Sequence, residues 1–209
     1  MGKLQNGILG TTTGKVGNVV GSRWKAFNTV RVYRPHITKS DTANAVNSRN
    51  TFALAVSLTR QLAPNIARTL LQRFESMMSG YNRLLSFIRL AFTLDGTFIP
   101  EKLMISKGRI NAPTITGTSS DGGEVQISWD TNTQGFEMSD DVPVAAVIDE
   151  LGLTGHSFDG ATKNYKRQSG TLKFNIPNTF NQSNAVYALA FRRADGTLIS
   201  DTAINVGDL

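Results

Sequence analysis

The spacing of hydrophobic residues changes once along this chain, at Pro100. Between Asp41 and Pro100, apolar residues recur three or four positions apart, which is typical of helices that bury one face. After Pro100 they recur at every second position, which is typical of β-strands. With 209 residues, 40% of them hydrophobic, the chain has enough apolar material for a substantial core. The pattern therefore predicts an α+β fold in which helices precede a strand-rich region.

The strand-rich region, 101–209, is predicted to form a β-sandwich. Its candidate strands are residues 103–106, 114–117, 124–129, 142–149, 170–176, 186–193 and 198–206. Asp195-Gly196, between two alternating runs, is the clearest hairpin signal. Alternate residues of 124–129 and 186–193 are apolar, so these two strands are predicted to face each other across one core. Strands of this number and spacing are typical of an immunoglobulin- or fibronectin-III-like domain.

Residues 40–94 are predicted to form a helical hairpin. The first helix begins at a cap on Ser40-Asp41 and ends near Leu62. Pro64 suits the first turn of a second helix, in which apolar residues alternate three and four positions apart. Gly80 lies inside that pattern and is a candidate break. The apolar face is wider than one partner helix covers, so it packs either against other copies or wholly within its own chain.

Residues 1–39 are predicted to be an extended, glycine-rich basic arm. The first 35 residues contain six glycines, six Lys or Arg and no Asp or Glu. Glycine loses much backbone entropy on folding, so this stretch is not expected to become ordered alone. Arg23–Tyr33 alternates like a strand, which would pair with a neighbouring chain or with the β-domain. A flexible tail is the simpler alternative, although tails seldom carry so many aromatic residues.

The arm also holds the candidate functional residues. Its apolar positions are predicted to form an assembly interface: Val19, Val20, Trp24, Phe27, Val30 and Val32. Its basic positions are predicted to contact an acidic partner: Arg23, Lys25, Arg31 and Arg34. Basic and aromatic residues in alternation can also bind phosphates and stack on bases. A protein partner is favoured over nucleic acid, because the segment alternates like a strand and has no known nucleic-acid motif.

The net charge of +6 is unevenly distributed. Through Leu94 there are thirteen Lys or Arg against two acidic residues, a net charge of +11. From Asp95 onward there are nine against fourteen, a net charge of −5. A basic half joined to an acidic half predicts copies that stack basic end to acidic end.

No motif predicts an enzyme, a metal site or another cofactor. The chain has no cysteine, and its two histidines, His36 and His156, are far apart. The Gly10–Gly14 loop resembles a phosphate loop, but the glycines are too close and Val16 stands where Ser or Thr must hold magnesium. An apolar run long enough to span a membrane is absent, and the N-terminus lacks the apolar core of a secretory signal. We therefore expect a non-enzymatic protein without membrane partners.

The arm resembles an uncharacterised protein family from Bacteroidota and their phages. Residues 6–10 and 14–22 match its opening N-G-x-x-G…GKVG motifs, and a basic Arg/Pro segment follows at 31–35. A tryptophan strand at 125–130 and a closing hairpin at 187–206 extend the resemblance over the whole chain. The family has no established activity, so the resemblance implies no catalytic residue. Its occurrence in phages, the crAss-like group among them, implies a virion component.

These observations lead us to expect a structural subunit of a phage virion, a tail or neck ring protein that is assembled in the host cytoplasm. Its expected partners are other copies of itself in a ring and neighbouring virion proteins. Rings form by heterologous contacts, in which one surface meets a different surface of the next copy. The alternative is a nucleic-acid-binding accessory protein that uses the same arm, and an enzyme of unrecognised type ranks third.

Overall fold

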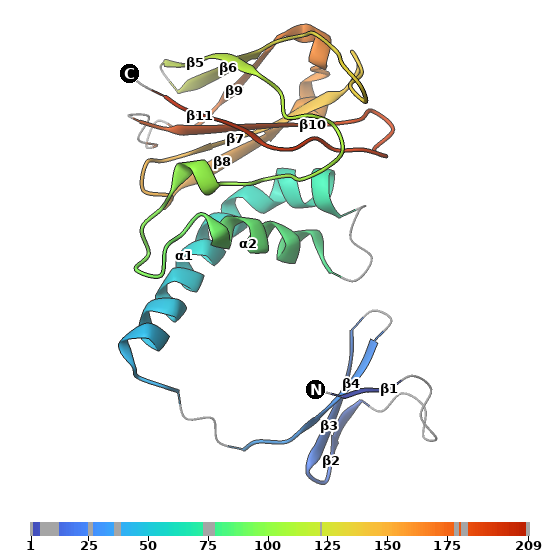
Figure 1. Ribbon diagram of the computed structural model, residues 1–209, viewed down its shortest axis with the longest axis vertical. Helices are drawn as coiled ribbons and strands as arrows, with labels where there is room; N and C mark the ends of the chain where they lie inside the picture. Colours follow the sequence, from blue (N-terminus) through green and yellow to red (C-terminus); the bar gives the residue numbers. More distant parts are fainter. Residues whose placement is uncertain are drawn as a thin grey trace. The chain divides into compact units, whose positions relative to one another are not determined.

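The chain is mixed α/β, with three antiparallel sheets and one main helix. The computed structural model describes residues 2–4, 13–24, 27–35, 39–72, 78–121, 123–177, 180 and 184–207. The chain divides into two compact units, Met1–Thr42 and Ala43–Leu209. Each unit has its own sheet or sheets (Figure 1).

The first unit is a four-stranded antiparallel sheet in the order β1-β4-β3-β2. Its strands are β1 (Gly2–Leu4), β2 (Gly14–Val16), β3 (Val19–Trp24) and β4 (Phe27–Val32). The prediction that Arg23–Tyr33 is a single strand is wrong, because β3 and β4 are separate strands with Trp24 opposite Phe27. In an extended arm, the backbone N–H and C=O groups would have to pair with a partner. In a hairpin, they pair with each other within the chain. The described part of the arm is therefore a folded sheet.

The second unit begins with its main helix. Helix α1 spans Ala43–Ile66 and continues into a π-helical turn, η1, at Ala67–Leu71. The prediction that Pro64 starts a new helix is wrong, because Pro64 lies inside α1. Proline removes one backbone hydrogen bond from a helix interior. Fully buried side chains four residues apart on both sides of the proline explain why the helix continues: Leu58, Leu62, Ile66 and Leu70.

Helix α2 spans Gly80–Leu90 and is much shorter than the second helix that the sequence predicts. Ser79 caps it, because its hydroxyl accepts a hydrogen bond from the Asn82 backbone N–H at 3.2 Å. A Cβ atom at Gly80 would lie 2.3 Å from the Ala67 carbonyl oxygen, so the close approach of the two helices requires glycine. Gly80 thus marks the beginning of a helix.

Two further antiparallel sheets complete the second unit, in the orders β11-β10-β7-β8 and β5-β6-β9. Their strands are β5 (Ile115–Asp121), β6 (Glu124–Trp129), β7 (Val142–Ile148), β8 (Gly155–Asp159), β9 (Thr171–Asn175), β10 (Val186–Arg192) and β11 (Ala203–Val206). Of three short 3-10 helices, η2 (Pro100–Lys102) lies between α2 and β5, and η3 (Gly160–Lys163) and η4 (Arg167–Ser169) lie between β8 and β9.

The predicted strands follow the same order, but β5 extends to Asp121 beyond the predicted 114–117, and β11 spans only Ala203–Val206 of the predicted 198–206. Two differences are larger. Residues 103–106 form no strand, since the Ile105 and Ser106 backbone N–H groups bond to the Thr202 hydroxyl. Strand β8 was not predicted, because its sequence, Gly-His-Ser-Phe-Asp, does not alternate. The turn predicted at Asp195-Gly196 is confirmed: Gly196 has φ of 72°, and its N–H bonds to the Arg193 carbonyl at 2.8 Å.

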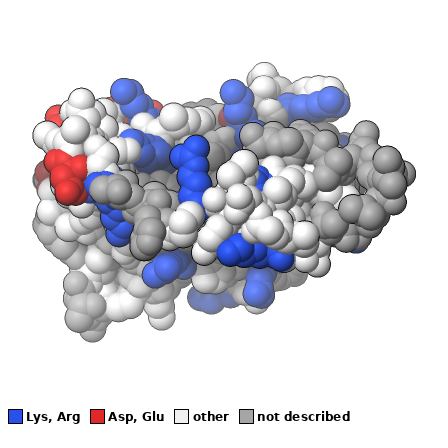
Figure 2. Space-filling model, turned by 90° about the horizontal axis from the view of Figure 1, so that it is seen from below, with Lys and Arg blue, Asp and Glu red and all other residues white. Residues whose placement is uncertain are grey.

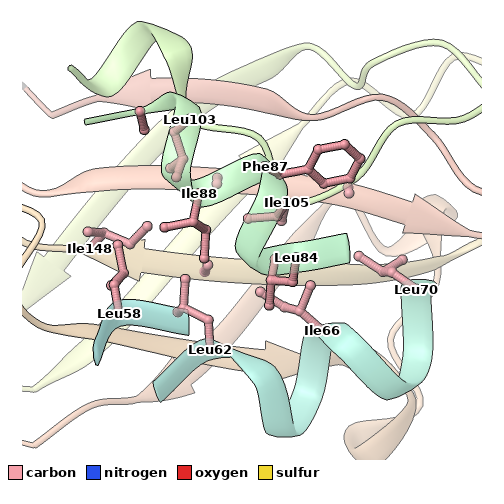
Figure 3. Close-up of a cluster of buried hydrophobic side chains, with 14 of the residues drawn as sticks. Leu58, Leu62, Ile66, Leu70, Leu84, Phe87, Ile88, Leu103, Ile105 and Ile148 are labelled. Atoms are coloured by element: carbon pink, nitrogen blue, oxygen red, sulfur yellow. The ribbon is translucent and has the colours of Figure 1, made fainter. Parts of the chain in front are cut away.

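The four-stranded sheet of the second unit is buried on both faces. Its first core contains Val144, Ala146 and Ile148 of β7, together with α1, η1 and α2 (Figure 3). Its second core contains the alternate β7 residues Ala145 and Val147, together with β6 and β9 of the other sheet. The structure therefore has layers of helices, sheet and sheet, as Figure 1 shows.

The two cores decide two questions that the sequence raises. The predicted core shared by 124–129 and 186–193 is confirmed, since the Trp129 and Phe191 rings meet edge to face with centroids 5.5 Å apart. The predicted segments 40–94 and 101–209 belong to one compact unit, because the helices pack on the sheet. The buried face of the described helices lies within its own chain.

Candidate assembly surface

The N-terminal sheet has almost no interior of its own. Among the residues of Met1–Thr42 whose burial the structure describes, only Gly21 is buried. Both hydrophobic clusters of buried residues lie in the second unit. A small sheet needs a covered apolar face to be stable. The sheet therefore has apolar surface that a partner can cover.

One face of this sheet carries a row of three exposed valines. The register places Val16 opposite Val19, and Val19 opposite Val32. Directly opposite residues place their side chains on the same face. Their exposed fractions are 69%, 40% and 70%, respectively. We call Val16, Val19 and Val32 the valine row.

A turn at Gly17-Asn18 positions this row. Gly17 has φ of 59°, which favours glycine, and the turn joins β2 to β3. The Asn18 carbonyl accepts a hydrogen bond from the Tyr33 backbone N–H at 2.7 Å, which continues the pairing beyond β4. Val16 was absent from the predicted interface. The Gly-Asn pair between two valines is a hairpin signal that could have identified it.

The opposite face of the sheet is basic. Val20, which is half-buried, lies opposite both Lys15 and Arg31. The Lys15 ammonium lies 3.8 Å from the centroid of the Tyr33 ring, within the range of a cation–π interaction. This face thus combines two cations with an aromatic ring.

The structure divides the predicted interface between the two faces. By strand alternation Val30 lies on the face of the valine row, and Phe27 lies on the face of Val20. Trp24 is paired with Phe27 along the backbone, but its side chain lies outside the described part of the structure.

The predicted basic contacts are divided in the same way. Arg23 lies opposite Asn28, on the face of the valine row, and Arg31 lies on the other face. Arg34 is exposed just beyond β4, and Lys25 lies outside the described residues.

All of the net charge belongs to the N-terminal unit. Residues 1–42 contain seven Lys or Arg and one acidic residue, a net charge of +6. Residues 43–209 contain fifteen of each sign, a net charge of zero. Figure 2 shows Lys and Arg side chains exposed at several separate places on the molecular surface. The compact units therefore separate charge less than the division at Leu94, because residues 43–94, with a net charge of +5, lie in the same unit as the acidic residues 95–209.

The most deeply buried charged cluster lies in the second unit and holds loops in place. Arg167 is 1% exposed, and its Nε atom lies 3.4 Å from the Asp141 carboxylate. Its guanidinium stacks 4.0 Å from the Phe191 ring centroid, and its carbonyl accepts a hydrogen bond from the Trp129 indole at 2.8 Å. Burial raises the pKa of the Asp141 carboxyl. These contacts fasten the loop before β7 and the helix η4 to the core between the sheets.

The described residues include neither a metal-binding cluster nor a helix that could span a membrane. Within them, no group of three His, Cys, Asp or Glu side chains is arranged to hold a metal ion. No helix among them has the length and apolar character needed to cross a membrane. His156 meets the Phe180 ring edge to face, and burial lowers its pKa. His36 lies outside the described residues.

Comparison with known proteins identifies the family. No curated protein matches this sequence. One family model matches residues 11–207, a span that includes every strand from β2 to β11. The chain belongs to DUF6266, a family of unknown function.

Proposed function

We propose that this protein is a non-enzymatic structural subunit that assembles through its N-terminal sheet. The observation that carries the proposal is a folded sheet with an exposed valine row and, among the residues whose burial is described, no buried apolar side chain. Covering that row removes apolar area from water, which stabilises both the sheet and the contact. The +6 charge of the same unit attracts an acidic surface and accelerates encounter.

The second unit supports the proposal as a rigid scaffold. Its second core joins β6 and β9 to β7 and β10, an arrangement compatible with a β-sandwich. We interpret these sheets as an immunoglobulin- or fibronectin-III-like domain with helices packed on its outer face. Such domains serve many functions, so the assignment of a structural role depends on the N-terminal sheet.

A phage virion is the setting that we propose for this subunit, as a tail or neck ring protein. The support is the resemblance of residues 6–10 and 14–22 to arms found in Bacteroidota and their phages. Ring formation needs one surface that docks on a different surface of the next copy. A sheet that is separate from its scaffold suits such a contact. Neighbouring virion proteins would then contact the surface of the N-terminal sheet or of the second unit.

Nucleic-acid binding is the second candidate function. It is favoured by the face that carries Lys15, Arg31 and Tyr33, since cations bind phosphates and aromatic rings stack on bases. The two candidates differ in how they respond to salt. A contact held by apolar side chains survives screening, whereas binding that neutralises phosphates weakens steeply as salt increases.

A salt titration of the purified full-length protein tests the proposal. We expect native mass measurement to give one defined oligomer that persists at about 1 M salt, where the screening length is about 3 Å. Binding of a fluorescent DNA duplex, measured in parallel, should be weak. A monomer at every protein concentration that binds the duplex tightly at low salt would favour the nucleic-acid candidate.

A further inference from the structure

The second unit has a groove that matches the N-terminal sheet in both apolarity and charge. We propose that this groove receives the valine row of a second copy of the chain. This inference rests on the proposed structural function and names the surface that the sheet contacts. The groove has a volume of about 710 Å³. The residues lining it include Asp95, Phe98, Glu150, Leu151, Leu153 and Val206.

Apolar side chains dominate the open part of the groove. Leu151, Leu153 and Val206 are 64%, 45% and 40% exposed, which is high for large apolar residues in a unit with two cores. Phe98, only 8% exposed, also lines the groove and packs on the Phe92 ring with centroids 5.3 Å apart. Apolar side chains gathered in a concave site are typical of a binding surface. They offer the valines of another copy a matching apolar contact.

One turn that lines the groove is held in place by contacts within the chain. Gly152 has φ of 68°, and a Cβ atom there would lie 2.6 Å from the Phe98 ring, so the close approach of this turn to the ring requires glycine. The Asp149 carboxylate fixes the same turn by accepting a hydrogen bond from the Leu153 N–H at 2.7 Å. A site that is ordered in advance loses less entropy on binding.

Charge identifies the occupant as the N-terminal sheet. The groove includes the exposed carboxylates Asp95 and Glu150, and none of the described residues that line it is Lys or Arg. The sheet belongs to the unit with net charge +6, and its exposed Arg23 lies on the same face as the valine row. Opposite charges around an apolar contact set both orientation and partner. A basic sheet and an acidic groove on each copy give a head-to-tail contact.

Two full-length variants and their mixture test the contact. Val16→Asp with Val32→Asp alters the row, and Leu151→Asp with Leu153→Asp alters the groove. We expect wild type to assemble and each variant alone to be monomeric by native mass measurement. An equimolar mixture should give a 1:1 dimer that grows no further, because one intact row and one intact groove remain. Leu90→Asp is the matched control, since Leu90 is 58% exposed and does not line the groove.

The possible outcomes distinguish a failure of the groove contact from a failure of the proposed structural function. If wild type stays monomeric, both are overturned. If wild type assembles and the groove variant gives the same oligomer, only the groove is overturned. If both variants are monomeric but form no mixed dimer, row and groove do not meet, and the inference is again overturned.

A charge exchange provides a second test that does not depend on the apolar substitutions. Glu150→Arg should weaken assembly by about tenfold or more, because it places like charges together. Adding Arg23→Glu, on the face of the valine row, to the same chain should restore most of the affinity. Circular dichroism of each variant confirms that it is folded. Failure of the second change to restore any affinity, in folded protein, would overturn the proposed orientation.

Discussion

The two units of this protein form antiparallel sheets under opposite conditions. In Ala43–Leu209, β7 and β10 are buried on both faces, between helices and a second sheet. In Met1–Thr42, the valine row is exposed and the whole net charge of the protein is concentrated. The larger unit derives its stability from its own cores, whereas the smaller one has surface left for a partner. The comparison shows that a shared strand geometry need not mean a shared source of stability.

Removing the smaller unit should have the largest effect on assembly and the smallest on the remaining fold. We expect residues 43–209 alone to be monomeric and to unfold at the same temperature as the full chain. The reason is that neither hydrophobic core includes a described residue from before Ala43. Native mass measurement and thermal unfolding followed by circular dichroism check both parts. An oligomer that persists without residues 1–42 would show that the sheet is not the connector.

Trp129→Ala should cause the largest loss of stability from a single substitution. Trp129 is 3% exposed, packs on Phe191 and donates its indole N–H to the Arg167 carbonyl. We expect the free energy of unfolding to fall by about 3–5 kcal/mol, because a cavity is left between the sheets. Urea unfolding measures the change. A loss below about 1 kcal/mol would contradict a rigid core between the sheets.

The same substitution in the two units should have unequal effects. Val125→Ala, at a fully buried position in β6, should lower the free energy of unfolding by about 2 kcal/mol. Val32→Ala, at a position 70% exposed in β4, should change it by less than about 0.5 kcal/mol. Urea unfolding should be measured at a concentration where the protein is monomeric, so that assembly does not contribute to the measured free energy. Equal losses would mean that the N-terminal sheet is covered within its own chain.

The pH dependence of the free energy of unfolding should show a smaller effect, which comes from Asp141. Burial raises the pKa of this carboxyl above its ordinary value of 3.8, so the folded protein keeps the proton to higher pH than the unfolded chain. Its contribution to stability is therefore full below pH 3.8 and declines as pH rises through the raised pKa. We expect the stability of wild type, relative to Asp141→Asn, to decline over that interval.

Urea unfolding at a series of pH values measures this decline, and Asp140→Asn, at an exposed neighbouring position, is the matched control. A relative stability that increases with pH would show that Arg167 governs the carboxylate more strongly than burial does.

Much of the larger unit was predictable because its local patterns agree with its packing. Strand β6 has the predicted bounds, and Asp195-Gly196 forms the predicted turn. The packing of helices on the sheet was not predicted, although β7 and β10 carry a signal for it. Residues 142–148 are almost continuously apolar, which is typical of a strand buried on both faces. The alternation of apolar residues in 124–129 and 186–193 identified only the core between the two sheets.

The N-terminal unit was harder to predict because its fold depends on a register. Reading 23–33 as one strand placed Trp24 and Val30 on the same side, whereas the β3–β4 hairpin reverses that relation. A shift of one residue in register exchanges the two faces of a strand. Exposed valines also carry no sign of what covers them. The identity of the candidate interface residues was therefore partly predictable, and their division between two faces was not.

The distance along the chain between groove residues has a consequence for the order of folding. The β2–β4 hairpins close within residues 14–32, whereas the groove brings together residues from 95 to 206. Local pairings form faster than pairings between distant segments. During synthesis, which proceeds from the N-terminus, the basic sheet is therefore complete long before any groove exists to receive it. Under the proposed contact, a nascent chain would present its sheet to finished copies before it could accept theirs, so assembly on the ribosome would proceed in one direction only.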